Sequence, residues 1–167
     1  LASEAKGDHR LLYATARLSR PVHISGTARI SIKLASSQPA VNLSVWLVSL
    51  PWTKGGRTND NIISRGWADP QNHESLRESE PLEPGKFYEM SFDFQPDDQV
   101  IPTGQRIGLM IFSSDKDFTL WPKPGTELTV DLGATSVELP VVGGAKALRR
   151  ATTPKRRRLS APRKPIF

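Results

Sequence analysis

The hydrophobic pattern of the chain is that of β-strands rather than helices. Residues 28–34 and 86–94 alternate between apolar and polar side chains, which is typical of strands with one buried and one exposed face. Residues 41–50 and 105–113 are instead apolar on both faces. Such runs are typical of strands buried on both sides, as in the middle of a two-sheet sandwich.

Turn signals separate the predicted strands, and no amphipathic helix lies between them. The segments 96–98 and 102–104, for example, combine Pro with Asp or Gly, as β-turns do. Strands joined by turns without a helix indicate antiparallel sheets. The sequence therefore predicts an all-β fold of about nine strands, a two-sheet antiparallel jelly-roll sandwich over residues 11–142. The remaining strands are expected at 11–15, 22–25, 62–68, 127–132 and 136–140.

Length and composition place this sandwich in one domain. The 167 residues can bury a substantial core, and the absence of cysteine excludes disulfides and thiolate metal sites. No run of about 18 apolar residues is present, so no membrane contact is expected. Residues 1–10 are polar and charged, and we interpret them as a lead-in from an upstream domain outside this chain. The cellular compartment stays open.

The net charge of +6 is unevenly distributed along the chain. Residues 1–142 hold 14 Lys or Arg and all 17 Asp or Glu, whereas residues 143–167 hold 9 basic and no acidic residues. The segment 143–167 has little apolar surface, so it is expected to be a disordered basic tail. Its cluster 155–158 is typical of a nucleic-acid arm or a localisation signal. The sandwich itself is mildly acidic, which favours a solvated tail and no nucleic-acid partner.

Motifs for catalysis and metal binding are missing from the sequence. Neither the G-x-S-x-G motif of α/β-hydrolases nor the H-E-x-x-H motif of zinc enzymes is present. The pairs Asp97 with Asp98 and Asp115 with Asp117 could supply oxygen ligands to calcium. Turn caps and surface salt bridges are the commoner roles of such short acidic pairs. We therefore expect no catalytic residue, no cofactor and no metal in this chain.

One segment concentrates groups that are suited to recognition. A cation, an aromatic ring, a carboxylate and an amide cluster at a strand end, in Arg65, Trp67, Asp69 and Asn72. They could form an interdomain contact or a pocket wall, with Trp121 as a second anchor. Alternatively, Arg65 and Asp69 pair locally while Trp67 fills the sandwich. Exposed tryptophans could also stack on a sugar, which would make the chain a free-standing carbohydrate-binding module.

Four stretches together resemble a known family. They read GDHRLLYAT, RGWADPQN, PLEPGKFYEMSFDFQPDDQVIPTGQRIGLMIFSSD and FTLWPKPGTELTVDL, and they span residues 7–142. This combination resembles the C-terminal domain of Xaa-Pro dipeptidyl-peptidases, within the wider group of cocaine-esterase-like serine hydrolases. The resemblance does not extend to the basic tail, because the family normally ends near the last strand.

The resemblance implies an accessory domain of a larger enzyme. In that family, a galactose-binding-like jelly roll packs on an α/β-hydrolase domain and a helical cap and helps to wall the active site. The Ser-Asp-His triad lies upstream, so none of its members corresponds to a residue here. The intact enzyme would release Xaa-Pro dipeptides from peptide N-termini, and peptide substrate would meet this domain only through the upstream domains. A homodimer through an uncovered apolar face stays open.

Overall fold

The computed structural model describes residue 7 and residues 9–153, which form ten strands and one α-helix. The strands are β1 (Arg10–Ala14), β2 (Val22–Gly26), β3 (Arg29–Ser36), β4 (Leu43–Leu50), β5 (Ile62–Ala68), β6 (Phe87–Asp93), β7 (Asp97–Ile101), β8 (Arg106–Phe112), β9 (Leu128–Val130) and β10 (Ser136–Glu138). The helices are α1 (Gly144–Thr152) and the 3-10 turns η1 (Thr58–Asn61), η2 (Pro70–Asn72) and η3 (Leu132–Ala134).

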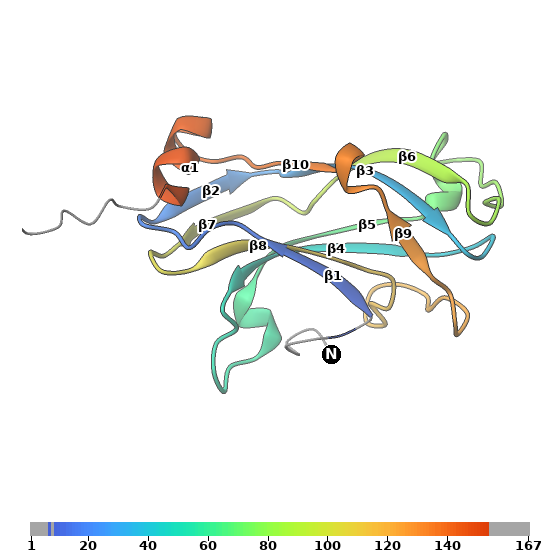
Figure 1. Cartoon of the computed structure of the whole chain (residues 1–167), viewed down its shortest axis with the longest axis horizontal. Helices are drawn as coiled ribbons and strands as arrows, with labels where there is room; N and C mark the ends of the chain where they lie inside the picture. The colour runs from blue at the N-terminus through green and yellow to red at the C-terminus, as the bar shows by residue number, and fades with distance from the viewer. Residues whose placement is uncertain (1–6, 8, 154–167) are drawn as a thin grey trace, which may run out of the picture.

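Two antiparallel four-stranded sheets form the two layers visible in Figure 1. The first sheet has the order β1-β8-β4-β5. The second has the order β10-β3-β6, and β9 also pairs with β3. A further two-stranded sheet joins β2 to β7. The expected antiparallel all-β architecture is confirmed, while jelly-roll connectivity stays a prediction.

The strands that the sequence marks as apolar on both faces lie in the middle of the first sheet. β8 pairs along its full length with residues 44–50 of β4, with Val45 opposite Ile111 and Trp46 opposite Met110. Seven of the eight residues of β4 are buried. Alternate side chains of these strands therefore enter two separate apolar clusters, one on each face of the sheet.

The inner cluster fills the space between the two sheets. β3 contributes Ile30, Ile32 and Leu34, which are 0%, 1% and 0% exposed. The first sheet contributes side chains such as Val45 and Ile111 from the facing side. Each large aliphatic side chain buried in this way contributes about 1.5–3 kcal/mol. The alternation read from residues 28–34 is therefore confirmed.

A second apolar cluster lies on the outer face of the first sheet, and we call it the outer cluster. Loop 51–61 borders it and is held in place by Asn61, whose side chain donates to the Ser49 carbonyl at 2.7 Å and accepts from Thr53 N at 2.8 Å. Figure 1 shows that this loop and the loop after β8 lie on the same side of the sandwich. The outer cluster comprises buried Trp46, Val48, Ile62 and Met110, with Leu12, Leu50, Trp52 and Phe112 partly buried beside them.

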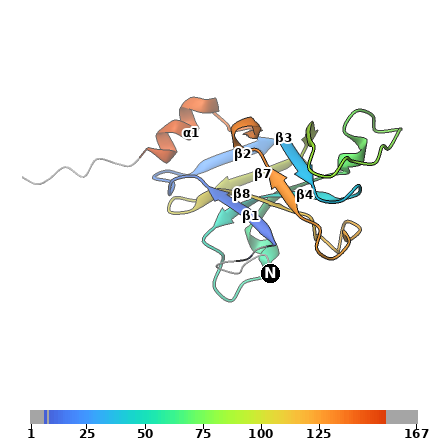
Figure 2. The ribbon, with the colours of Figure 1, turned by 45° about the vertical axis from the view of Figure 1, so that its right-hand side comes forward.

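The expectation of a disordered segment starting at residue 143 is wrong for α1. This helix lies beside β2 at one end of the sandwich, as Figure 2 shows. Ala151 is 1% exposed within the inner cluster, and Leu148 packs against it. Ser19 fixes the end of the helix, because its N–H and Oγ donate to the Ala151 carbonyl at 2.7 Å and 2.9 Å. The rest of the predicted tail, 154–167, lies outside the described residues.

β7 occupies a place where the sequence suggested only a turn. Its residues pair with β2, with His23 opposite Val100 and Gly26 opposite Asp97. Its burial alternates, but the exposed positions include Val100, which is 56% exposed. Asp97 and Gln99 are polar although they point inward, and Val100 is apolar although it is exposed. The sequence of β7 therefore lacks the apolar–polar alternation that predicts a strand. Within the described residues no helix is long and apolar enough to span a bilayer.

Candidate functional site

A buried carboxylate ties the outer cluster to the loop that follows β8. Asp115 is 6% exposed, and its Oδ2 accepts hydrogen bonds from the indole N–H groups of Trp46 and Trp67, both at 3.1 Å. The two tryptophans come from neighbouring strands, β4 and β5. Asp115 therefore fixes the start of loop 113–127 on the first sheet, rather than joining Asp117 in a calcium site.

Arg65 belongs to the same cluster through its guanidinium plane. The guanidinium carbon lies 5.2 Å from the ring centroid of Trp46 and 5.2 Å from that of Phe118. Its Nη2 donates to Asn59 Oδ1 at 2.8 Å. This is cation–π geometry. The local pairing of Arg65 with Asp69 that the sequence left open is not seen among the described ion pairs.

Trp67 presents one side of its ring to the loop after β8. Its ring lies 5.1 Å from that of Phe118 with an interplanar angle of 30°. Phe118 is itself 56% exposed, so the aromatic stack continues to the surface. We call Trp46, Arg65, Trp67, Asp115 and Phe118 the Asp115 cluster. One carboxylate, one guanidinium and three aromatic rings thus join the first sheet to an exposed loop.

Asp69 and Asn72 shape the loop after β5 instead of joining the Asp115 cluster. Asp69 Oδ1 accepts from Gln71 N at 2.9 Å and caps η2. The Asn72 amide donates to the carbonyls of Ser75 at 3.0 Å and Glu78 at 3.1 Å. These bonds are typical of Asx caps and turns. Both side chains therefore stabilise the backbone of the loop after β5 through hydrogen bonds.

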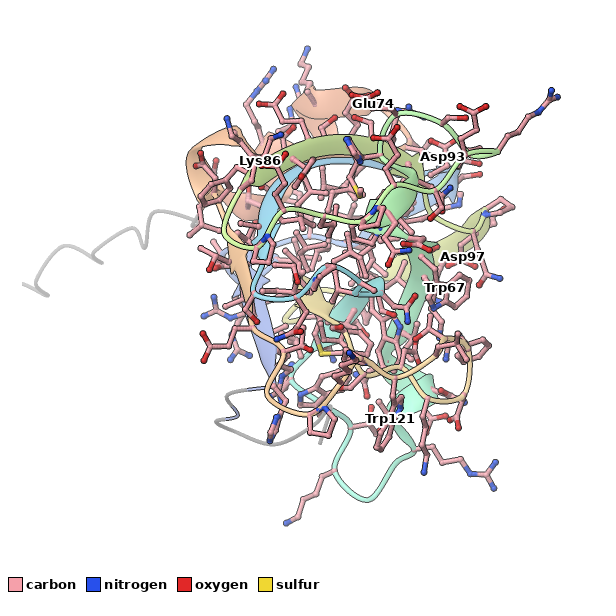
Figure 3. The ribbon with its side chains drawn as sticks, turned by 90° about the vertical axis from the view of Figure 1, so that its right-hand side faces the viewer. Trp67, Glu74, Lys86, Asp93, Asp97 and Trp121 are labelled. Carbon is pink, nitrogen blue, oxygen red and sulfur yellow. The ribbon has the colours of Figure 1, made fainter. Side chains whose placement is uncertain are left out.

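Trp121 lies in an exposed part of the loop after β8. It is 65% exposed, and its neighbour Leu120 is 82% exposed. Both line a pocket of about 310 Å³ that also contains Asp69 and Asn42. Figure 3 shows Trp121 below Trp67 on this view of the molecule. The structure therefore brings Trp121 together with Asp69, while Arg65 and Trp67 form a separate group.

Sequence reasoning missed the central role of Asp115 and the stacking of Phe118. Trp46 and Asp115 are 69 positions apart in the chain, and Trp67 and Asp115 are 48 apart. No local spacing signals contacts over such separations. From the sequence, the pair Asp115 and Asp117 suggested only calcium ligation, and two acidic residues in a loop are weak evidence for a metal site.

The histidines and acidic residues of the described part are not gathered into a metal-binding group. No group of three or more His, Asp or Glu side chains in the described part could hold a metal ion. His23 pairs with Asp98 across β2 and β7, and the His73 ring packs on Tyr88 at 4.5 Å. Both histidines are therefore engaged in contacts within the sandwich, away from the Asp115 cluster.

Comparison with known proteins shows the same family along almost the whole chain. The family described as "X-Pro dipeptidyl-peptidase C-terminal non-catalytic domain" matches residues 1–158. The match passes the last strand and includes α1, so the expectation that the family ends near residue 142 is wrong. A protein of Rhodopirellula baltica named "Putative Xaa-Pro dipeptidyl-peptidase" is 63% identical over 146 residues, which are 86% of this chain and 23% of that protein.

Solved structures share the fold at low sequence identity. An aminopeptidase from the marine sediment archaeon Thaumarchaeota archaeon has a TM-score of 0.68 and 18% identity, over 83% of this chain and 26% of that one. A CocE/NonD family hydrolase from Staphylococcus aureus has a TM-score of 0.56 and 10% identity, over 83% and 34%. The chain spans about a quarter of the length of the curated relatives it matches. It belongs to the family of C-terminal non-catalytic domains of X-Pro dipeptidyl-peptidases.

Proposed function

We propose that this chain is the accessory β-sandwich of a prolyl dipeptidyl-peptidase-type serine hydrolase. It packs on the α/β-hydrolase and cap domains of the same protein and helps to wall their active site. The intact enzyme releases Xaa-Pro dipeptides from peptide N-termini, and the chemistry takes place in the upstream domains. The membership of the family and the fourfold greater length of the relative support this division of labour.

The loop after β8 is the observation that carries the proposal. Phe118, Leu120 and Trp121 are 56%, 82% and 65% exposed, although they lie within four residues of one another. Large apolar side chains grouped on a surface mark a protein contact or a ligand site. Asp115 holds the start of this loop on the first sheet, so the exposed side chains are presented from a fixed base.

The predicted site residues take different parts in this contact. Trp121 is an anchor that enters the neighbouring domain, and Asp69 forms the adjacent pocket wall. Arg65 and Trp67 support the loop from beneath through their contacts with Phe118. Asn72 fixes the loop after β5, which borders the same region. Contact and support are therefore separate roles within one surface.

The test uses the full-length protein that contains this chain. Replacing Leu120 and Trp121 by Ala is expected to lower kcat/KM for an Xaa-Pro p-nitroanilide about tenfold, since a buried aromatic anchor is commonly worth more than 1 kcal/mol. Leu76→Ala is the matched control, because Leu76 is 95% exposed on a different loop. Equal activity of the double variant and the control would contradict the proposal.

A carbohydrate-binding module is the second candidate. The observation in its favour is exposed Trp121 in one pocket with Asp69 and Asn42, because sugars stack on aromatic rings and bond to polar groups beside them. Calorimetric titration of this chain with a panel of oligosaccharides separates the two functions. Saturable sugar binding that Trp121→Ala abolishes would favour this candidate, and no binding would exclude it.

A further inference from the structure

Asp115 is 6% exposed, and only one of its two carboxylate oxygens accepts hydrogen bonds from described residues. Both indole donors reach the same oxygen, Oδ2, at 3.1 Å. Among the described residues, none donates a hydrogen bond to Oδ1 or forms an ion pair with Asp115. Oδ1 is not among the described side-chain atoms that lack both solvent and a hydrogen-bond partner, so solvent still reaches it. A docked domain that excluded this solvent would leave a charged oxygen in need of a donor or a cation.

Asp115 also lines a small pocket in the surface. The pocket has a volume of about 170 Å³, and the outer-cluster residues Trp46, Met110 and Phe112 form its apolar wall. The rings of Trp46 and Phe112 meet edge to face, with centroids 4.9 Å apart. The pocket therefore combines a buried carboxylate with aromatic surface. This combination suits a planar cation, which can pair with the acid while its faces contact the rings.

The cations already near this pocket do not occupy the carboxylate. Arg65 contacts the Trp46 ring but donates to Asn59 at 2.8 Å. Arg10 and Lys116 also line the pocket, and Arg10 has an interaction of its own. The pocket is therefore not uniformly acidic. The features that favour a cation are the low exposure of Asp115 and the absence of a described hydrogen-bond donor to its Oδ1, rather than the net charge of the pocket.

We propose that Asp115 receives an arginine side chain from the upstream hydrolase domain when the two domains pack together. This inference rests on the proposed function and names the chemistry of its contact. Packing a neighbouring domain over the pocket would remove the water that now reaches Asp115. The carboxylate would then need a partner, and a guanidinium can bond to Oδ1 while it lies against the aromatic wall. Asp115 thus becomes a positioning residue for the docked domain.

The first arm of the test uses this chain labelled with 5-fluorotryptophan. Fluorine resonances of Trp46 and Trp67 report directly on Asp115, because both indoles bond to it. Ethylguanidinium chloride is expected to shift them saturably, and its uncharged analogue ethylurea is expected to bind about tenfold more weakly or worse. Asp115→Asn should abolish the difference. Asp117→Asn, on the same pocket but exposed, should preserve it.

The spectra also show whether each variant is folded, since all four tryptophans report on the structure. Equal responses to the two probes, or no response in the wild-type chain, would overturn the cation site. Should Asp115→Asn fail to fold, the comparison of the two probes on wild-type chain and Asp117→Asn still decides the matter.

The second arm places the same label in the full-length protein. If an upstream arginine fills the pocket, ethylguanidinium will leave the Trp46 and Trp67 resonances unmoved there. If ethylguanidinium shifted these resonances as much in the full-length protein as in the isolated chain, the pocket would be empty there and the proposed arginine would be contradicted. Hydrolysis of an Xaa-Pro p-nitroanilide by the same sample tests the proposed function separately, so failure of one does not imply failure of the other.

Discussion

Asp115 shows how one residue can connect distant parts of the chain. Its carboxylate accepts the indole protons of Trp46 and Trp67, which would otherwise be shielded from water without an acceptor. Both tryptophans could be picked from the sequence as anchors of the fold or of a surface. Their common acceptor could not, because only pairing of β4 with β5 and β8 brings the three residues together.

Replacing Asp115 by Ala should destabilise this chain by about 3 kcal/mol, because it removes two hydrogen bonds to a charged acceptor and leaves two indole donors unpaired. Asp115→Asn should cost less, since the amide oxygen can still accept. Urea unfolding followed by tryptophan fluorescence measures both. The control is Asp117→Ala, at an exposed position two residues away. A loss for Asp115→Ala no larger than for this control would contradict the role of Asp115.

Gly108 occupies a closely packed position in the middle of the first sheet. A Cβ at this position would lie 2.9 Å from Val48 Cγ2 and 3.0 Å from Leu50 Cδ1. Gly108→Ala is therefore expected to cost about 1–3 kcal/mol through overpacking. The control is Gly133→Ala, whose Cβ would approach only the Asp131 carboxylate, at 3.3 Å. Equal midpoints of thermal unfolding for the two variants would contradict the prediction, because they would show that β4 and β8 accommodate the added methyl group without a loss of stability.

Among the elements, α1 is the one that composition hid. Basic residues and few β-formers suggested a solvated tail, yet Leu148 and Ala151 share a face that joins the inner cluster. The strands were easier, because their alternation or two-sided apolarity follows directly from burial. β7 was the exception, since it covers little core and its side chains carry no clear period.

Truncation tests the contribution of α1. A chain that ends after residue 142 loses the helix and should be less stable by about 3 kcal/mol, because the apolar contacts of Leu148 and Ala151 are lost. A chain that ends after residue 153 keeps the helix and serves as the control. Chemical denaturation of both measures the difference. Equal stability of the two chains would mean that α1 adds nothing to the sandwich.

On the scale of the whole molecule, the first sheet is apolar on both faces. The second sheet covers the inner face, whereas short loops cover the outer face. One of these loops, which follows β8, exposes Phe118, Leu120 and Trp121 to solvent. The sequence could predict the antiparallel all-β architecture and the family to which the chain belongs, whereas an anchor at Trp121 stays a prediction. It could not predict which residues share a surface, because Arg65 contacts Phe118 and Asp69 lines a pocket with Trp121, both of which lie about fifty positions away in the chain.

Hydrogen–deuterium exchange of this chain, alone and within the full-length protein, tests the docking of the domain most directly. Amides of β1 and of loop 113–127 are predicted to exchange about tenfold more slowly in the full-length protein, because a neighbouring domain covers them. Amides of β6, in the second sheet, are predicted to exchange equally in both. Equal exchange throughout would show that the sandwich does not pack on the hydrolase domain through this face, which would contradict the account.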